Sequence, residues 1–364
     1  MHITDLKLQN FRLFKDTEIT FVPGINVFFG ENGQGKTTIL EAVRFLSTTR
    51  SFLTDSSKEM VSFDSDYFFL RSRFIKKSFP HEIKFGWSEK SKKVSCNGHH
   101  LKVLSDLLGV MDTVLFIASD YDLVCGGPEA KRRYLDIQLS QADPGYLHSL
   151  KNYHRILKNR NALLKKKRYS KTEMETWSSA LIRTGSAVIL DRAKSVRDIE
   201  RYAAGFLRIL STEKENLRIR YLSLTQAVSL VEIERHFRIA LEKTEQKEKE
   251  MGYTMIGPHR DDLLFLLNEK EMKKYASRGQ IKSASVSLKL AEKENLKNRK
   301  GVSPIFLIDD IFSDLDRVRR RQFIRLLEPG HQVIIGTTHH EELIRDMDPD
   351  QPVKTSKVIL GRVA

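Results

Sequence analysis

Residues 30–38, GENGQGKTT, have the residue types and the spacing of a phosphate-binding loop. They fit the pattern G-x-x-x-x-G-K-[ST] at every fixed position. Glycine lets the backbone wrap closely around phosphate oxygens, and successive N–H groups then point at the anion. The expected nucleotide-binding residues are Gly30, Glu31, Asn32, Gly33, Gln34, Gly35, Lys36, Thr37 and Thr38. Lys36 can reach the β- and γ-phosphates, and the Thr37 hydroxyl can bind Mg²⁺.

A second chemical feature lies far along the chain, where the apolar run PIFLID ends on two carboxylates. Asp309 can hold Mg²⁺, directly or through water, and Asp310 can orient or deprotonate an attacking water. Two Asp residues after an apolar strand are more often a turn or a helix N-cap. Their presence in one chain with a phosphate-binding loop favours the catalytic interpretation, with ATP and Mg²⁺ as cofactors.

The elements that must position these residues follow from the apolar patterns. Apolar runs at 25–30, 304–309 and 331–338 predict buried strands, and helical spacing predicts a helix over 38–47. Strands are also predicted at 3–9, 67–75 and 81–87, with a hairpin turn at Asn97 and Gly98. Helical patterns run from about 128 to 245, and again over 280–298 and 314–327. We therefore expect one α/β P-loop ATPase head with an inserted, mainly helical lobe.

The expected boundaries follow from this layout. Residues 1–118 form the N-terminal part of ATPase lobe I, residues 119–295 form the helical lobe II, and residues 296–364 complete lobe I. A small-molecule kinase would place its second carboxylate closer to the loop. A long insertion is instead typical of the ATPase heads that sandwich ATP between two copies.

Charge and composition point to a polyanionic partner. The chain has 62 Lys plus Arg against 47 Asp plus Glu, a net charge of +15. A solvated basic surface is the alternative to nucleic-acid binding. Eleven basic residues cluster between 131 and 168: Lys131, Arg132, Arg133, Lys151, Arg155, Lys158, Arg160, Lys165, Lys166, Lys167 and Arg168.

Composition also bears on the compartment. No apolar stretch approaches a membrane span, the first residues read as a strand rather than a signal peptide, and there are two cysteines. A reducing cytoplasm is the expected location, with no membrane partner.

The motifs together resemble the RecF family, in order, from residue 6 to about 340. They are NFR at 10–12, GENGQGKT at 30–37, RSF at 50–52, SDYDLV at 119–124, GP at 127–128, RRYLD at 132–136, GPHRDDL at 257–263, SRGQ at 277–280, DD at 309–310 and SDLD at 313–316. The RRYLD and GPHRDDL segments make this resemblance far more specific than the phosphate-binding loop alone.

The resemblance implies an ABC-type head of the kind found in SMC proteins, without a long coiled coil. It implies ATP-dependent homodimerisation, weak DNA-stimulated ATP hydrolysis that acts as a switch, and binding to gapped, single- and double-stranded DNA. It further implies cooperation with RecO and RecR in loading RecA during recombinational repair, replication restart and the SOS response.

Individual roles are implied in the same way. Ser277, Gly279 and Gln280 match the ABC signature, which in the family contacts the γ-phosphate of ATP held by the other subunit. Asp316 matches the D-loop aspartate at the dimer seam, and Arg12 is expected near the nucleotide.

His339 stands at the switch position of ABC proteins, where it would sense the γ-phosphate. The alternative is a polar residue at a strand end. For His259, a rigid hydrogen-bonded turn between the lobes is favoured over a catalytic role.

Two departures from the ABC pattern leave questions open. No glutamine occurs between Gln34 and Gln138, so the Q-loop role is unassigned; Asp120 or Asp122 is a candidate. The second carboxylate is Asp310 where most ABC proteins have Glu, and the shorter side chain favours slow turnover. The alternatives are a DNA clamp with ATP as a ligand only, and a transporter ATPase subunit.

Overall fold

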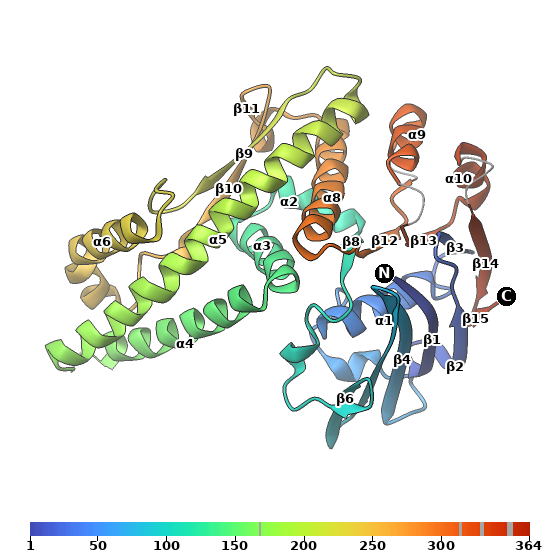
Figure 1. Cartoon of the computed structure of the whole chain (residues 1–364), viewed down its shortest axis with the longest axis horizontal. Helices are drawn as coiled ribbons and strands as arrows, with labels where there is room; N and C mark the ends of the chain where they lie inside the picture. Colours follow the sequence, from blue (N-terminus) through green and yellow to red (C-terminus); the bar gives the residue numbers. More distant parts are fainter. Residues whose placement is uncertain (167–168, 313–314, 328–330, 348–351) are drawn as a thin grey trace. The chain divides into compact units, whose positions relative to one another are not determined.

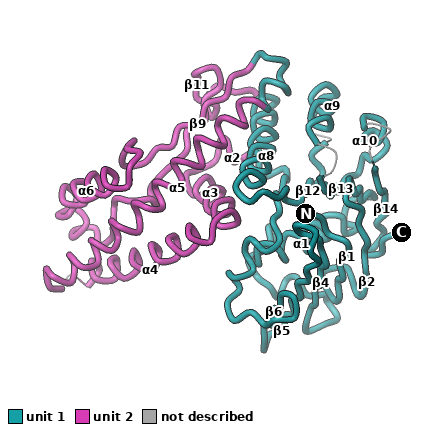
Figure 2. The backbone as a smooth tube through the Cα atoms, viewed as in Figure 1, with its two compact units in different colours: residues 1–121, 206–214, 278–364 teal, residues 122–205, 215–277 magenta. Residues whose placement is uncertain are grey.

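The computed structural model describes residues 1–166, 169–312, 315–327, 331–347 and 352–364. The predicted roles of Lys167, Arg168, Ser313 and Asp314 therefore lie outside the described residues. The chain divides into two compact units (Figure 2). Unit 1 comprises residues 1–121, 206–214 and 278–364, and unit 2 comprises residues 122–205 and 215–277.

The central sheet of unit 1 has the strand order β15-β14-β3-β13-β12-β8. Five strands run parallel, and β15 is antiparallel to β14. The bounds are β3 (Ile25–Phe29), β8 (Thr113–Phe116), β12 (Ile305–Asp309), β13 (Val333–Thr337), β14 (Val353–Ile359) and β15 (Arg362–Val363). Strands β8, β12 and β13 are almost wholly buried, which explains their continuous apolar sequences.

A second, antiparallel sheet in unit 1 has the order β2-β1-β4-β5-β6-β7. Its strands are β1 (His2–Phe11), β2 (Phe14–Thr20), β4 (Tyr67–Lys76), β5 (Phe79–Ser88), β6 (Ser91–Cys96) and β7 (His99–His100). The hairpin turn is confirmed, because Asn97 and Gly98 both have positive φ (50° and 81°).

Helix α1 (Lys36–Thr48) packs against both sheets of unit 1 (Figure 1). Its Leu40 and Val43 belong to the same core as Leu70 of β4 and Leu307 of β12. Because this helix begins at the phosphate-binding loop, its burial on both sides fixes the loop in place.

The remaining helices of unit 1 follow in the C-terminal third of the chain: α8 (Arg278–Lys300), α9 (Arg317–Arg325) and α10 (His340–Asp346). Helix α8 packs beside β8 and groups with unit 1. From the sequence, residues up to 295 were expected in helical lobe II. The predicted lobe boundary and the boundary between the two compact units therefore differ at α8.

Unit 2 is mainly helical, with α3 (Pro128–Ala142), α4 (Pro144–Lys166), α5 (Lys171–Ser211, whose last residues group with unit 1) and α6 (Leu230–Met251). A three-stranded antiparallel sheet joins β9 (Leu217–Leu222), β10 (Asp262–Leu267) and β11 (Lys270–Glu271), followed by α7 (Met272–Tyr275). The prediction of continuous helix to 245 is wrong at β9. Its sequence LRIRYL buries alternate residues and pairs with β10, so a sheet partner decides its conformation.

The GPHRDDL turn is held by a polar network inside unit 2. Arg192 is almost fully buried; it donates to Asp136 at 2.8 Å and to the Pro258 carbonyl at 2.7 Å, and forms an ion pair with Asp261 at 3.6 Å. The hydroxyl of Tyr221 donates to Asp261. The turn is thus hydrogen-bonded, and the partners named here belong to one unit rather than to two lobes.

His259 takes part in the same network. Its Nε2 lies 3.0 Å from the Thr254 carbonyl, which can only accept, so Nδ1 accepts from the Tyr153 hydroxyl at 2.5 Å. Burial lowers the pKa of His259 to about 4. A neutral, fully bonded imidazole supports a structural role.

The predicted fold class is confirmed: an α/β P-loop ATPase head whose sheet is built from both ends of the chain, with a helical insertion. Among the described residues, no helix is long and apolar enough to cross a membrane.

Candidate nucleotide-binding site

The phosphate-binding loop connects β3 to α1, as the sequence predicts. Gly30, Gly33 and Gly35 have φ of 150°, 78° and 114°, which residues with a Cβ rarely adopt. A Cβ on Gly30 would lie 2.5 Å from the Val358 carbonyl oxygen, while the Cβ position of Gly33 has no neighbour within 4 Å. The loop therefore needs glycine for its conformation, and at Gly30 also for close packing.

The ammonium group of Lys36 lies across the loop. It donates to the carbonyls of Gly30 at 2.8 Å and Glu31 at 2.7 Å. Burial lowers the pKa of Lys36, and the nearby Asp310 and Asp309 oppose that shift. A partly desolvated cation at this position is suited to binding a phosphate oxygen.

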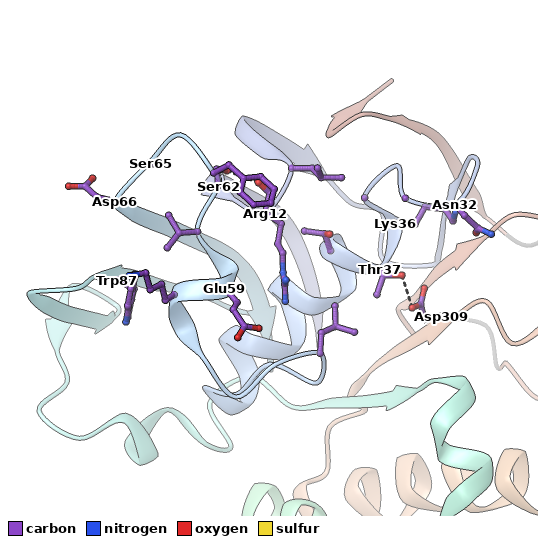
Figure 3. Close-up of a pocket in the computed structure, with 18 of the residues that line it drawn as sticks. Arg12, Asn32, Lys36, Thr37, Glu59, Ser62, Ser65, Asp66, Trp87 and Asp309 are labelled. Carbon is purple, nitrogen blue, oxygen red and sulfur yellow. Dashed lines mark hydrogen bonds between the residues drawn. The ribbon is translucent and has the colours of Figure 1, made fainter.

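Thr37 and Asp309 meet although they are far apart in sequence. The Thr37 hydroxyl donates to Asp309 Oδ2 at 2.8 Å (Figure 3). Burial raises the pKa of Asp309, an effect that a bound cation would reverse. A hydroxyl and a carboxylate are hard oxygen ligands, so these two residues fit Mg²⁺, which would neutralise phosphate charge.

Asp310 adopts a left-handed backbone conformation, with φ of 50°. Its N–H donates to the Gly336 carbonyl at 2.8 Å, and its Oδ1 accepts from the Thr338 hydroxyl at 3.3 Å. Asp is one of the residue types that tolerate this conformation through local hydrogen bonds. The turn after β12 therefore directs the carboxylate toward the end of β13, beside the predicted switch segment.

His339, in that segment, is the N-cap residue of α10, and its N–H donates to the Thr337 hydroxyl at 3.0 Å. Thr338 was not among the predicted site residues, although it contacts Asp310 directly. Its signal in the sequence was its place in the Thr-Thr-His run at the strand end.

A cavity of about 910 Å³ joins these groups within unit 1 (Figure 3). Nine of the predicted residues line it: Arg12, Asn32, Gly33, Gly35, Lys36, Thr37, Thr38, Asp309 and Asp310. Its lining continues to apolar side chains that the sequence did not indicate, namely Leu53, Val61, Phe63 and Trp87. The same part of the lining also carries Lys58, Glu59, Asp66 and Glu89, so the phosphate-binding groups adjoin a wider surface of mixed apolar and charged side chains.

Arg12 is held toward this cavity by a buried carboxylate. It donates to Glu41 through Nε at 2.9 Å and Nη2 at 2.7 Å, and the Glu41 side chain is fully buried. The Ser51 hydroxyl also donates to Glu41. Glu41 and Ser51 were missed as positioning residues; the RSF motif at 50–52 was the only available signal.

Gln34 does not line the cavity and instead ties the loop to the C-terminal hairpin. Its carbonyl accepts from the Gly361 N–H at 3.1 Å, and its side-chain Oε1 accepts from the Leu360 N–H at 2.8 Å. With the contact between Gly30 and Val358, this makes the last residues of the chain a support for the phosphate-binding loop.

The predicted signature glycine, Gly279, and the D-loop aspartate, Asp316, are not part of this cavity's described lining. Asp316 is the N-cap residue of α9 and accepts from the Arg319 N–H at 2.9 Å. A Cβ on Gly279 would lie 2.8 Å from Arg319 Nη1, so the signature glycine and the residues after the D-loop are neighbours in unit 1. Ser277 is the last residue of unit 2.

Asp120, a candidate for the missing Q-loop residue, has its carboxylate engaged. It accepts from the Ile117 N–H at 2.9 Å and forms an ion pair with Lys289 of α8 at 3.1 Å. This geometry favours a role in fixing α8 beside β8.

Comparison with known proteins agrees with this geometry. A family model described as an AAA ATPase domain matches residues 1–300. The DNA replication and repair protein RecF of Halalkalibacterium halodurans is 35% identical over 345 residues, 93% of each chain. That of Lachnoclostridium phytofermentans is 35% identical over 368 residues, 100% of this chain and 99% of the relative. The chain belongs to the RecF family.

Solved structures support the same conclusion. The recombination mediator protein RecF with ATPrS, described as part of the RecFOR pathway, superposes with a TM-score of 0.90 at 31% identity, covering 100% of this chain and 97% of that one. RecF with ATP gives 0.89 at 32% identity, covering 100% and 96%. An Smc head bound to the C-terminal winged-helix domain of ScpA gives 0.59 at 14% identity, covering 100% and 96%, which shows the shared head fold alone.

Proposed function

We propose that this RecF-family protein is an ATP-dependent DNA-binding switch of recombinational repair. ATP closes a homodimer on DNA, and slow hydrolysis opens it. The observation that carries the proposal is that Lys36, Thr37, Asp309 and Asp310 line one and the same cavity. Solved relatives named as RecF with ATP and with ATPrS support ATP as the nucleotide.

Each residue of the cavity has a role in this proposal. Lys36 binds the β- and γ-phosphates, and the loop N–H groups cradle them. Thr37 and Asp309 hold Mg²⁺. Asp310 accepts a proton from the attacking water, and Arg12, braced by Glu41, contacts the nucleotide.

The signature acts in trans. Ser277, Gly279 and Gln280 complete the site of the partner copy, with Asp316 at the seam and His339 sensing the γ-phosphate. Gly279 and Asp316 do not belong to the described lining of the chain's own cavity. A role in the site of a partner copy is compatible with that position. A helix N-terminus beside glycine is suited to binding an anion.

The wider context rests on family membership. We propose that the protein acts in the cytoplasm at gapped DNA, with RecO and RecR as partners in loading RecA. The relatives' names, DNA replication and repair protein and recombination mediator of the RecFOR pathway, support this assignment.

The deciding experiment measures ATP turnover and sedimentation, each with and without DNA. The proposal expects slow turnover that DNA accelerates, and a shift from monomer to dimer that requires ATP. Dimerisation with no turnover would favour the clamp in which ATP is only a ligand. Turnover with neither dimerisation nor DNA stimulation would contradict the switch.

A further inference from the structure

The structure separates the basic residues between 131 and 166 into two groups. Three are internal: Lys131 donates to the Leu263 carbonyl, Arg132 to the Asp261 carbonyl, and Arg160 to Thr254. These cations hold unit 2 together. Most of the exposed ones lie on a single helix, α4 (Figure 1).

Helix α4 has 23 residues and contains no Asp or Glu. At about 100° of rotation per residue, its exposed cations fall within an arc of roughly 100°. These cations, the α4 basic stripe, are Lys151, Arg155, Lys158, Lys165 and Lys166. They extend over about 22 Å of the helix axis at about 1.5 Å per residue.

The opposite face of α4 is the packed one. Tyr146, Tyr153, Ile156, Arg160 and Leu164 are buried there. The one cation on this face, Arg160, is paired with the buried Glu248 at 2.7 Å. The helix therefore neutralises the charge that it buries, whereas Arg155, Lys158, Lys165 and Lys166 lie exposed on its outward face.

No acidic partner offsets most of the α4 basic stripe. Within the described part of the chain, Arg155, Lys158, Lys165 and Lys166 form no ion pair; Arg155 has only a weak hydrogen bond to Asn152 at 3.5 Å. Like charges spaced along one face repel one another, and an anionic partner relieves that repulsion.

We propose that the α4 basic stripe binds the phosphate backbone of duplex DNA. This inference rests on the proposed DNA-binding function and assigns it a surface. A duplex carries one negative charge per about 1.7 Å of its axis, so a cation row of this length matches the phosphates along one groove edge. Lysine and arginine contacts of this kind position DNA without reading its sequence.

A neighbouring helix of unit 2 provides a matched control. Helix α6 has 22 residues, and its sequence mixes six Glu with five Lys or Arg. Its Arg235, Lys243 and Lys247 are exposed. Replacing three cations by Gln on either helix changes the net charge equally, so only the position of the loss differs.

The test compares Arg155→Gln/Lys158→Gln/Lys165→Gln with Arg235→Gln/Lys243→Gln/Lys247→Gln in the full-length protein with ATP. Duplex DNA affinity is measured over a salt series. Three lost phosphate contacts flatten the log–log salt slope by about 2.7 and weaken binding several hundredfold near 0.1 M salt. The α6 variant should bind close to wild type. An Arg155→Lys/Lys158→Arg/Lys165→Arg variant should retain the slope.

The outcomes separate the inference from the function beneath it. If wild type binds DNA and the α4 and α6 variants lose affinity equally, only total charge matters and the stripe assignment fails. Unchanged DNA affinity in the α4 variant would also overturn it. If wild type itself binds no DNA with ATP, the proposed function fails first.

Discussion

Replacing Asp310 by Asn should stop hydrolysis and leave the fold intact, because the structure separates the two roles of this residue. Asn tolerates the positive φ of 50° as Asp does. Its Oδ1 can still accept from Thr338, and the backbone bond to Gly336 is unaffected. We expect the free energy of unfolding to change by no more than about 0.5 kcal/mol.

The chemical effect should be much larger. An amide cannot take the proton of the attacking water, and a positioned general base contributes about 10²–10⁴ in rate. At about 1.36 kcal/mol per tenfold, the barrier should rise by roughly 2.7–5.5 kcal/mol. Removing this negative charge also lowers the pKa of Asp309, which favours its ionised, metal-binding form.

The assay is DNA-stimulated phosphate release, combined with nucleotide titration and sedimentation. Asp310→Asn should bind ATP normally and accumulate as an ATP-bound dimer. Asp310→Ala is the control: it also loses the bonds to Thr338 and places Ala in the left-handed region, at a cost of about 1–2 kcal/mol. Hydrolysis by the Asn variant at the wild-type rate would refute the reasoning and locate the catalytic carboxylate elsewhere.

Four further expectations follow from the site and from unit 2. Lys36→Ala should abolish nucleotide binding in a titration, since a charge-assisted phosphate contact is lost; near-native ATP affinity would contradict the loop assignment. Glu41→Gln should weaken ATP binding and lower the free energy of unfolding by about 2 kcal/mol, because Arg12 loses charged hydrogen bonds; calorimetry should show a smaller loss for Ser51→Ala. Ser277→Arg should bind ATP as a monomer but neither dimerise nor hydrolyse it, and normal dimerisation in sedimentation would remove the trans signature. His259 should titrate near pH 4 by NMR, since burial lowers its pKa to about 4. The contribution of its neutral form to the free energy of unfolding is complete above about pH 6.5 and is lost as the pH falls toward 4. A titration near pH 6.5 would contradict its burial.

The features that the sequence determined are those written in short, contiguous segments. The phosphate-binding loop is recognisable from residues 30–38 alone, because its conformation requires glycines at fixed spacing. Strands β3, β12 and β13 of the parallel sheet were predictable because their sequences are continuous apolar runs, whereas β8 and β14 were not predicted. The proximity of Thr37 and Asp309 was expected only because the phosphate-binding loop and the apolar strand ending at Asp309 were both assigned ligands of the same Mg²⁺ ion.

Long-range packing decided the rest. Strand β9 is a strand because β10 pairs with it. Glu41 braces Arg12, and the C-terminal hairpin holds Gln34. These contacts join segments that are distant in the chain, and neither segment's sequence indicates its partner. The basic residues show the same limit. Arg160 and Lys158 lie two positions apart on one helix. Only the tertiary structure shows that Arg160 is buried against Glu248, whereas Lys158 is exposed to solvent. Burial of a charge depends on the partners that the fold brings to it, and those partners are not local in sequence.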